Sequence, residues 1–187
     1  MRQQHHRGMR AFTLIEILVV VVILGIAGAI IIPQMSSRDD LRVSAASRIL
    51  MADLIYAQNM SITRQVNHCV VFDIAGSPRS YWVARASALN TPITHPVNKV
   101  PYRGTFGAGG TGGLANISLN SARFDGTSAG AFTSAIGFDE LGTPLMYNSD
   151  GTYEVLSQGA IELQAGAQKM RIAVEPYTGQ ITITNVP

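Results

Sequence analysis

The chain has 187 residues, of which 47% are hydrophobic and 14% charged, and its formal net charge is +2. This length suits one modest domain plus a short additional segment, and the single cysteine excludes an internal disulfide. Beyond residue 33 there are 11 basic residues (14 less the three before Phe12) and 11 acidic residues (12 less Glu16), a balance that argues against a polyanion-binding surface.

Residues 1–11 form a short basic leader, and an apolar segment follows at residues 12–32. Glu16 is the only charged residue in that segment, and three arginines precede it. As a helix, these residues would be about 31 Å long, which is enough to cross the hydrocarbon core of a bilayer. By the positive-inside rule, the arginines predict a cytoplasmic N-terminus and a C-terminal domain on the other side of the membrane.

An ordinary secretory signal is the alternative to a retained helix. Ala27-Gly28-Ala29 has the small-x-small form of a signal cleavage site. However, the apolar run continues through Ile30, Ile31 and Ile32, so it is longer than a normal signal h-region. A glutamate five residues into that region has no purpose in a disposable signal. We therefore expect the helix to be retained.

The junction between the leader and the apolar segment resembles a known family. Phe12-Thr13-Leu14-Ile15-Glu16 is similar to the prepilin cleavage and methylation motif of type IV pilins and type II secretion pseudopilins. The resemblance implies that prepilin peptidase cuts between Ala11 and Phe12 and methylates the new amine of Phe12. The mature chain would then have 176 residues (187 less 11). Ala11 departs from the pattern, because the family strongly prefers glycine there.

The resemblance also assigns roles to three residues of the mature helix. Glu16 would be the assembly glutamate, and Gly25 and Pro33 match positions where the family often has a helix-loosening glycine and proline. A carboxylate in hydrocarbon costs about 2.5–3.5 kcal/mol or more, so Glu16 needs a partner. In a filament, the resemblance implies, that partner is the N-terminal amine of a neighbouring subunit. The alternative is a glutamate that is merely tolerated near the lipid headgroups.

A second helical stretch is predicted after Pro33, reaching about Arg64. Pro33 cannot donate an intrahelical hydrogen bond, so it should bend or loosen the helix. Beyond it, apolar residues recur at helical spacing and form one face, which should pack on a sheet. The members of this face are Ala46, Ile49, Leu50, Leu54, Ala57 and Met60.

The hydrophobic period changes to that of strands from Val66 onward. Val66–Asp73 and Ser80–Arg85 are predicted to form a hairpin, in which Trp82 anchors one face. The Gly-rich residues 104–116 predict a loop. Further strands are expected at residues 117–120, 122–125, 135–139, 161–164, 170–174 and 180–184. The expected fold is α+β and pilin-like: a long N-terminal spine helix, its first half transmembrane, packed on antiparallel β-sheets, with a periplasmic domain at residues 33–187.

The later segments resemble one type of minor pilin in particular. The helix that leads into Val70-Val71-Phe72-Asp73 is similar to that of the pseudopilin H type, and so are residues 136–142 and 172–181. The resemblance implies a spine helix carrying two antiparallel sheets. It also implies a place near the tip of a short periplasmic pseudopilus, or a role as a minor pilin.

No motif predicts catalysis, and we expect no enzyme, no cofactor and no metal site. The G-x-G-x-x-G string at residues 107–112 has no convincing strand before it and no helix after it, as a dinucleotide site requires. The G-x-S-x-G string at residues 126–130 lacks the later histidine of a hydrolase. His68 and His95 have no partner at ligand spacing.

The leading hypothesis is therefore a minor pseudopilin, a structural subunit of the pseudopilus of a type II secretion system. The expected partners are prepilin peptidase, other pseudopilins or pilins through the N-terminal helix, and the inner membrane; neither nucleic acid nor a small-molecule substrate is expected. The alternative is a minor type IV pilin involved in pilus assembly or DNA uptake. A third class, a secreted enzyme with a signal peptide, would require loss of residues 12–29.

Overall fold

The computed structural model describes residues 13–34, 38–128 and 132–186, with side chains for all of these except residues 29–34 and 132. The chain divides into two compact units, residues 1–38 and 39–187. The predicted boundaries at residues 11 and 32 concern processing and membrane insertion, which this division does not address, so they stay predictions.

The described part of the first unit is dominated by helix α1 (Leu14–Gln34). Its residues are almost all apolar, and Glu16 lies in its first turn. Gly25 lies inside the helix, and Pro33 lies one residue before its end. The backbone is therefore helical past Gly25 up to the residue that follows Pro33.

Helix α2 (Arg38–Arg64) carries the predicted amphipathic face and ends at the predicted residue. Ile49 and Met60 lie at the edge of that face and are half-buried. Two buried serines on the same face have partners, since Ser47 donates to the carbonyl of Val43 (2.8 Å) and Ser61 to that of Ala57 (3.1 Å). The fully buried apolar residues of the helix are Val43, Ala46, Leu50, Leu54 and Ala57.

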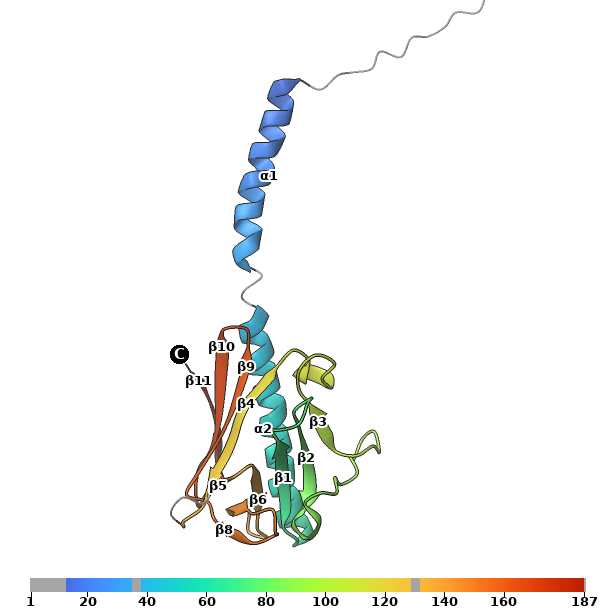
Figure 1. Cartoon of the computed structure of the whole chain (residues 1–187), viewed down its shortest axis with the longest axis vertical. Coiled ribbons are helices and arrows are strands. Elements are labelled where there is room, and N and C mark those ends of the chain that lie inside the picture. The colour runs from blue at the N-terminus through green and yellow to red at the C-terminus, as the bar shows by residue number, and fades with distance from the viewer. Residues whose placement is uncertain (1–12, 35–37, 129–131, 187) are drawn as a thin grey trace, which may run out of the picture. The chain divides into compact units, whose positions relative to one another are not determined.

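Among the described residues, eleven strands form two sheets in which every pairing is antiparallel (Figure 1). The six-stranded sheet has the order β3 (Arg103–Thr105), β2 (Ser80–Arg85), β1 (His68–Asp73), β6 (Ala135–Phe138), β7 (Pro144–Tyr147) and β8 (Tyr153–Val155). The five-stranded sheet has the order β11 (Ile181–Val186), β10 (Gln168–Val174), β9 (Gln158–Ala165), β4 (Ser118–Asp125) and β5 (Phe132–Thr133). The α+β prediction, one helix packed on antiparallel sheets, is confirmed.

The predicted hairpin is confirmed, since β1 and β2 pair antiparallel, and Val70 lies opposite Val83. Two predictions about strands were wrong. Residues 117–120 and 122–125 were expected as separate strands but form the single strand β4, whose pairing with β9 shifts between Leu119 and Ser121. The expected loop at residues 104–116 begins with part of β3, which extends the six-stranded sheet.

One core joins α2 to both sheets (Figure 1). It contains Leu50 and Leu54 of α2, and the ring of Phe72 in β1 lies 5.8 Å from that of Phe124 in β4, so this pair crosses from one sheet to the other. Such ring pairs add about 0.5–1.5 kcal/mol beyond the area that they bury. A smaller cluster, which includes Cys69 and Tyr147, is separate from this core.

Candidate functional site

Helix α1 begins with a cap made by Thr13. The backbone N–H of Glu16 donates to Thr13 Oγ1 at 3.3 Å and to the Thr13 carbonyl at 3.1 Å, and the N–H of Ile17 donates to the same carbonyl at 3.2 Å. The spacing Thr13-x-x-Glu16 is that of a capping box, in which a threonine caps the helix and a glutamate occupies the third position. Sequence reasoning missed this motif, although the spacing alone would have indicated it.

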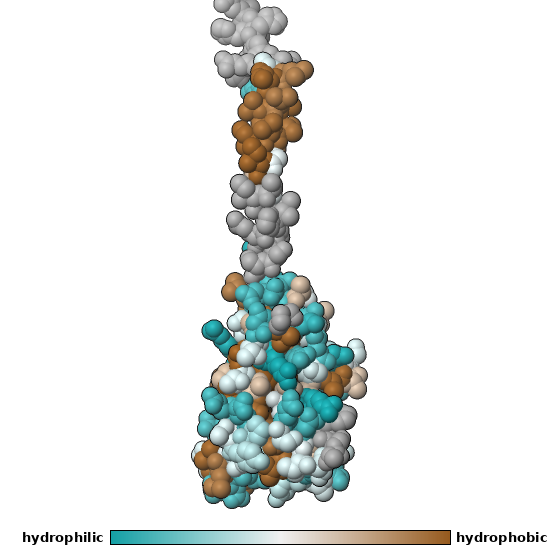
Figure 2. All heavy atoms as spheres, turned by 90° about the vertical axis from the view of Figure 1, so that its left-hand side faces the viewer, coloured by the Kyte–Doolittle hydropathy of each residue, from teal (hydrophilic) through white to brown (hydrophobic). Residues whose placement is uncertain are grey.

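The described apolar side chains of α1, up to residue 28, have no core of their own. From Leu14 to Ile26 the large hydrophobic side chains are 47–85% exposed, with Leu14 at the upper limit. Figure 2 shows them as a mostly brown surface on the face of α1 in view. A helix that is apolar on all sides needs cover from a membrane or from other protein, and Glu16 is the only charge among its described side chains.

The remaining predicted site residues fall in different places. Ala11 and Phe12 lie outside the described residues. At Gly25, no atom lies within 4 Å of the place that a Cβ would occupy, so the helix surface there is open. Pro33 is described by its backbone alone. Among the residues with described side chains, no helix combines the length and the apolarity needed to cross a membrane. The transmembrane role of residues 12–32 and the roles of these residues stay predictions.

A comparison with protein families gives a match to the segment that contains most of α1. The family model of the prokaryotic N-terminal methylation motif matches residues 6–32. This motif indicates a type IV pilin-like or pseudopilin protein. It also implies processing by prepilin peptidase, assembly between pilin-like subunits in general, and a membrane-anchored protein of the surface or periplasm. No curated protein and no solved structure matches the chain.

The globular unit holds a partly buried carboxylate, Asp53, on α2. Asp53 accepts hydrogen bonds from two tyrosine hydroxyls, one from Tyr81 of β2 and one, at 2.9 Å, from Tyr102 just before β3. The ring of Tyr102 stacks on that of Tyr56, with centroids 5.2 Å apart, and its other neighbour is the ring of His95 at 4.4 Å. This cluster of Asp53, Tyr56, Tyr81, His95 and Tyr102 therefore links α2 to the edge of the six-stranded sheet.

The electrostatics of this cluster follow from its burial. Burial raises the pKa of Asp53, and the two tyrosine hydrogen bonds and the nearby His95 counteract part of that effect. Burial and the neighbouring Asp53 also raise the pKa of Tyr81 and of Tyr102, so both hydroxyls keep their protons and remain donors. Within the described residues, no group of three or more His, Cys, Asp or Glu side chains is placed to hold a metal ion. We interpret the cluster as structural.

Proposed function

We propose that this chain is a minor pseudopilin of the H type, a structural subunit of the pseudopilus of a type II secretion system rather than an enzyme. The observation that carries the proposal is Glu16. It is the single charge on an exposed, apolar helix, and it lies inside the matched methylation motif. A lone carboxylate in such surroundings is costly without a partner of opposite charge.

The proposed mechanism is assembly. Prepilin peptidase cuts between Ala11 and Phe12, and the methylated amine of Phe12 becomes the first group of the mature helix. The subunit rests in the inner membrane as a single-pass protein, with its N-terminus cytoplasmic and its C-terminal domain periplasmic. On assembly, the amine of a neighbouring subunit pairs with Glu16, and the apolar helices bundle. Gly25 and Pro33 loosen the helix so that it can follow the path of the bundle.

Glu16→Gln tests this mechanism better than an alanine variant does. Glutamine also suits the third position of a capping box, and the Thr13 cap receives the backbone N–H, so the substitution removes the charge and keeps the helix start. Removing one partner of a buried ion pair costs about 3–5 kcal/mol, which corresponds to more than a hundredfold loss of pairing. We expect normal membrane insertion and a strong loss of incorporation into filaments.

Thr13→Val is the matched control for that experiment. It removes the capping hydroxyl, which costs about 1 kcal/mol of helix stability, and leaves the charge of Glu16 in place. We expect near-normal incorporation. If Glu16→Gln enters filaments as well as the wild type does, the charge-pairing mechanism is wrong.

The same motif also suits a minor type IV pilin that acts in pilus assembly or DNA uptake. The two roles differ in what is lost when the gene is deleted. Loss of protein secretion with intact pili supports the pseudopilin role, and loss of pili or of DNA uptake with intact secretion supports the alternative. The balanced charge beyond residue 33 is the reason that we rank the pseudopilin role first.

A further inference from the structure

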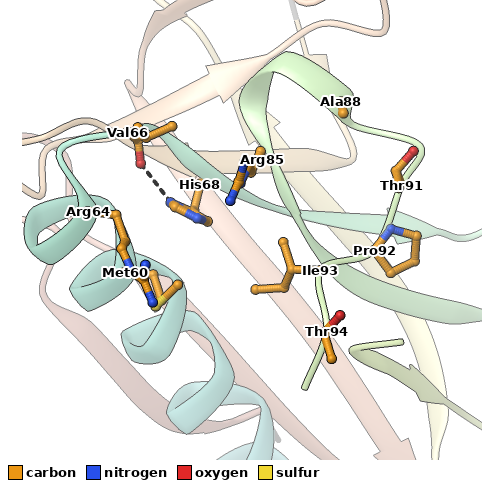
Figure 3. Close-up of a pocket in the computed structure, with 10 residues that line it drawn as sticks. All are labelled: Met60, Arg64, Val66, His68, Arg85, Ala88, Thr91, Pro92, Ile93 and Thr94. Atoms are coloured by element: carbon orange, nitrogen blue, oxygen red, sulfur yellow. Dashed lines mark hydrogen bonds between the residues drawn. The ribbon is translucent and has the colours of Figure 1, made fainter. Parts of the chain in front are cut away.

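A pocket of about 670 Å³ opens beside the C-terminal end of α2 (Figure 3). Arg64 ends α2, Arg85 ends β2, and His68 begins β1, so three chain segments bring basic side chains to one place. The side chains of Met60 and Ile93 form apolar parts of the pocket wall. No aspartate or glutamate is among the residues that line the pocket. The volume lies in the range of sites that bind small molecules.

Among the described residues, neither arginine of the pocket has an acidic partner. Within the described part of the chain, the ion pairs are Arg42 with Asp39 and Arg123 with Asp125. No side-chain hydrogen bond or ion pair joins Arg64 or Arg85 to another described residue, and both residues are exposed. Two guanidinium groups therefore face the same space with all their donors free to bind an anion.

His68 gives the pocket a buried polar group as well. The residue is only 2% exposed, its backbone N–H donates to Ser61 Oγ at 2.9 Å, and its Nδ1 lies 2.6 Å from the carbonyl of Val66. That contact places a proton on Nδ1. Among the described residues, none donates a hydrogen bond to Nε2 of His68 or accepts one from it. Figure 3 shows the ring of His68 in the pocket, between Arg64 and Arg85.

We propose that this pocket binds the carboxylate of an aspartate or glutamate side chain that a partner protein presents on an apolar segment. Guanidinium groups bind carboxylates through paired N–H donors, and the apolar wall suits the neighbouring residues of such a segment. A phosphate fits less well, because the C-terminal end of α2 carries partial negative charge, which disfavours a doubly charged anion. The pocket belongs to the globular unit, so the proposal does not depend on the assembly role of Glu16.

The test is a binding titration with the full chain in detergent micelles. The probe is a short, fluorescently labelled peptide with one glutamate between leucines, and the same peptide with glutamine is the reference. We expect the combined variant Arg64→Gln and Arg85→Gln to weaken binding about tenfold, since each exposed charge contact is worth up to about fivefold. Arg48→Gln is the matched control, because Arg48 is an exposed arginine of α2 outside the pocket, and it should leave binding unchanged.

The pH dependence gives an independent readout. Burial lowers the pKa of His68, and the Arg85 and Arg64 charges lower it further. A carboxylate bound beside the ring favours its protonated form, so binding should strengthen as the pH falls below about 6.5, the ordinary pKa of histidine. The residue paired with His68 in β6 is Phe138, which does not titrate.

Three results would overturn the proposal. The first is equal affinity for the glutamate and glutamine peptides, which would mean that the pocket binds the apolar residues of the peptide and does not recognise the carboxylate. The second is equal loss of binding in the Arg48 control. The third is binding of free glutarate or inorganic phosphate as tight as that of the peptide, which would make it a small-anion site. Glu16→Gln should bind the peptide normally, so this test and the assembly test can fail separately.

Discussion

Tyr81→Phe probes the cluster that fastens α2 to the six-stranded sheet. The substitution removes one hydroxyl and keeps the ring, whose contacts with Phe72 (5.8 Å between centroids) and Phe106 (5.6 Å) remain. Asp53 then keeps only the hydrogen bond from Tyr102. A hydrogen bond to a charged group contributes about 1.5–3 kcal/mol, and a neutral one about 0.5–1.5 kcal/mol. The cost of the substitution should therefore depend on the charge of Asp53.

The sign of that dependence follows from the raised pKa of Asp53. The stability that Asp53 contributes is greatest below the unfolded pKa of about 3.9, and it is lost as the pH rises through the folded pKa. Below this window the carboxyl is neutral and the missing hydroxyl costs about 0.5–1.5 kcal/mol; above it the cost rises to about 1.5–3 kcal/mol.

Urea unfolding of the full chain, followed at both ends of that pH window, measures these costs. Tyr177→Phe is the matched control, because Tyr177 is 76% exposed, and it should change the free energy of unfolding by less than about 0.5 kcal/mol. A cost for Tyr81→Phe that is the same at both pH values would refute the charge-dependent hydrogen bond.

Two further predictions concern the core. Leu54→Ala should lower the free energy of unfolding by about 2–5 kcal/mol, because Leu54 is fully buried in α2, whereas Leu41→Ala at a 69% exposed position should cost less than about 0.5 kcal/mol. Equal costs in urea unfolding would contradict the placement of the buried face. Burial raises the pKa of the Cys69 thiol to about 12, so a thiol reagent should label Cys69 only as fast as the protein unfolds. Rapid labelling of the folded protein would show that this thiol is accessible.

Periodicity in the sequence was enough to predict α2 and its buried face. Apolar residues recur there every three or four positions, and an almost entirely apolar segment such as α1 is equally easy to recognise. The sequence patterns did not predict the strands β7 and β8, because neither strand shows the sustained alternation of apolar and polar residues that marks a half-buried strand. All four residues of β7 are buried, so it shows no alternation, and its first residue is Pro144, a residue type that is more typical of turns than of strands. β8 has only three residues.

The sites of the globular unit could not be predicted, because each depends on residues far apart in the chain. Asp53, Tyr81 and Tyr102 meet only after α2 packs against the edge of the sheet. His68 was set aside because no ligand lies near it in sequence, yet folding brings Arg64 and Arg85 to its pocket. The N-terminal segment differs, because its predicted site residues lie within one short stretch of sequence. The methylation motif, matched at residues 6–32, covers all of them except Pro33.

The mass of the mature chain, taken from cells that also make prepilin peptidase, tests the central claim most directly. The account predicts a chain of 176 residues (187 less 11) that begins at Phe12 and carries one methyl group on its amine. A chain that still begins with the leader, or one that has lost residues through Ala29, would contradict it. The first result would mean that the Ala11–Phe12 bond is not cut, and the second would mean that the segment is a disposable signal.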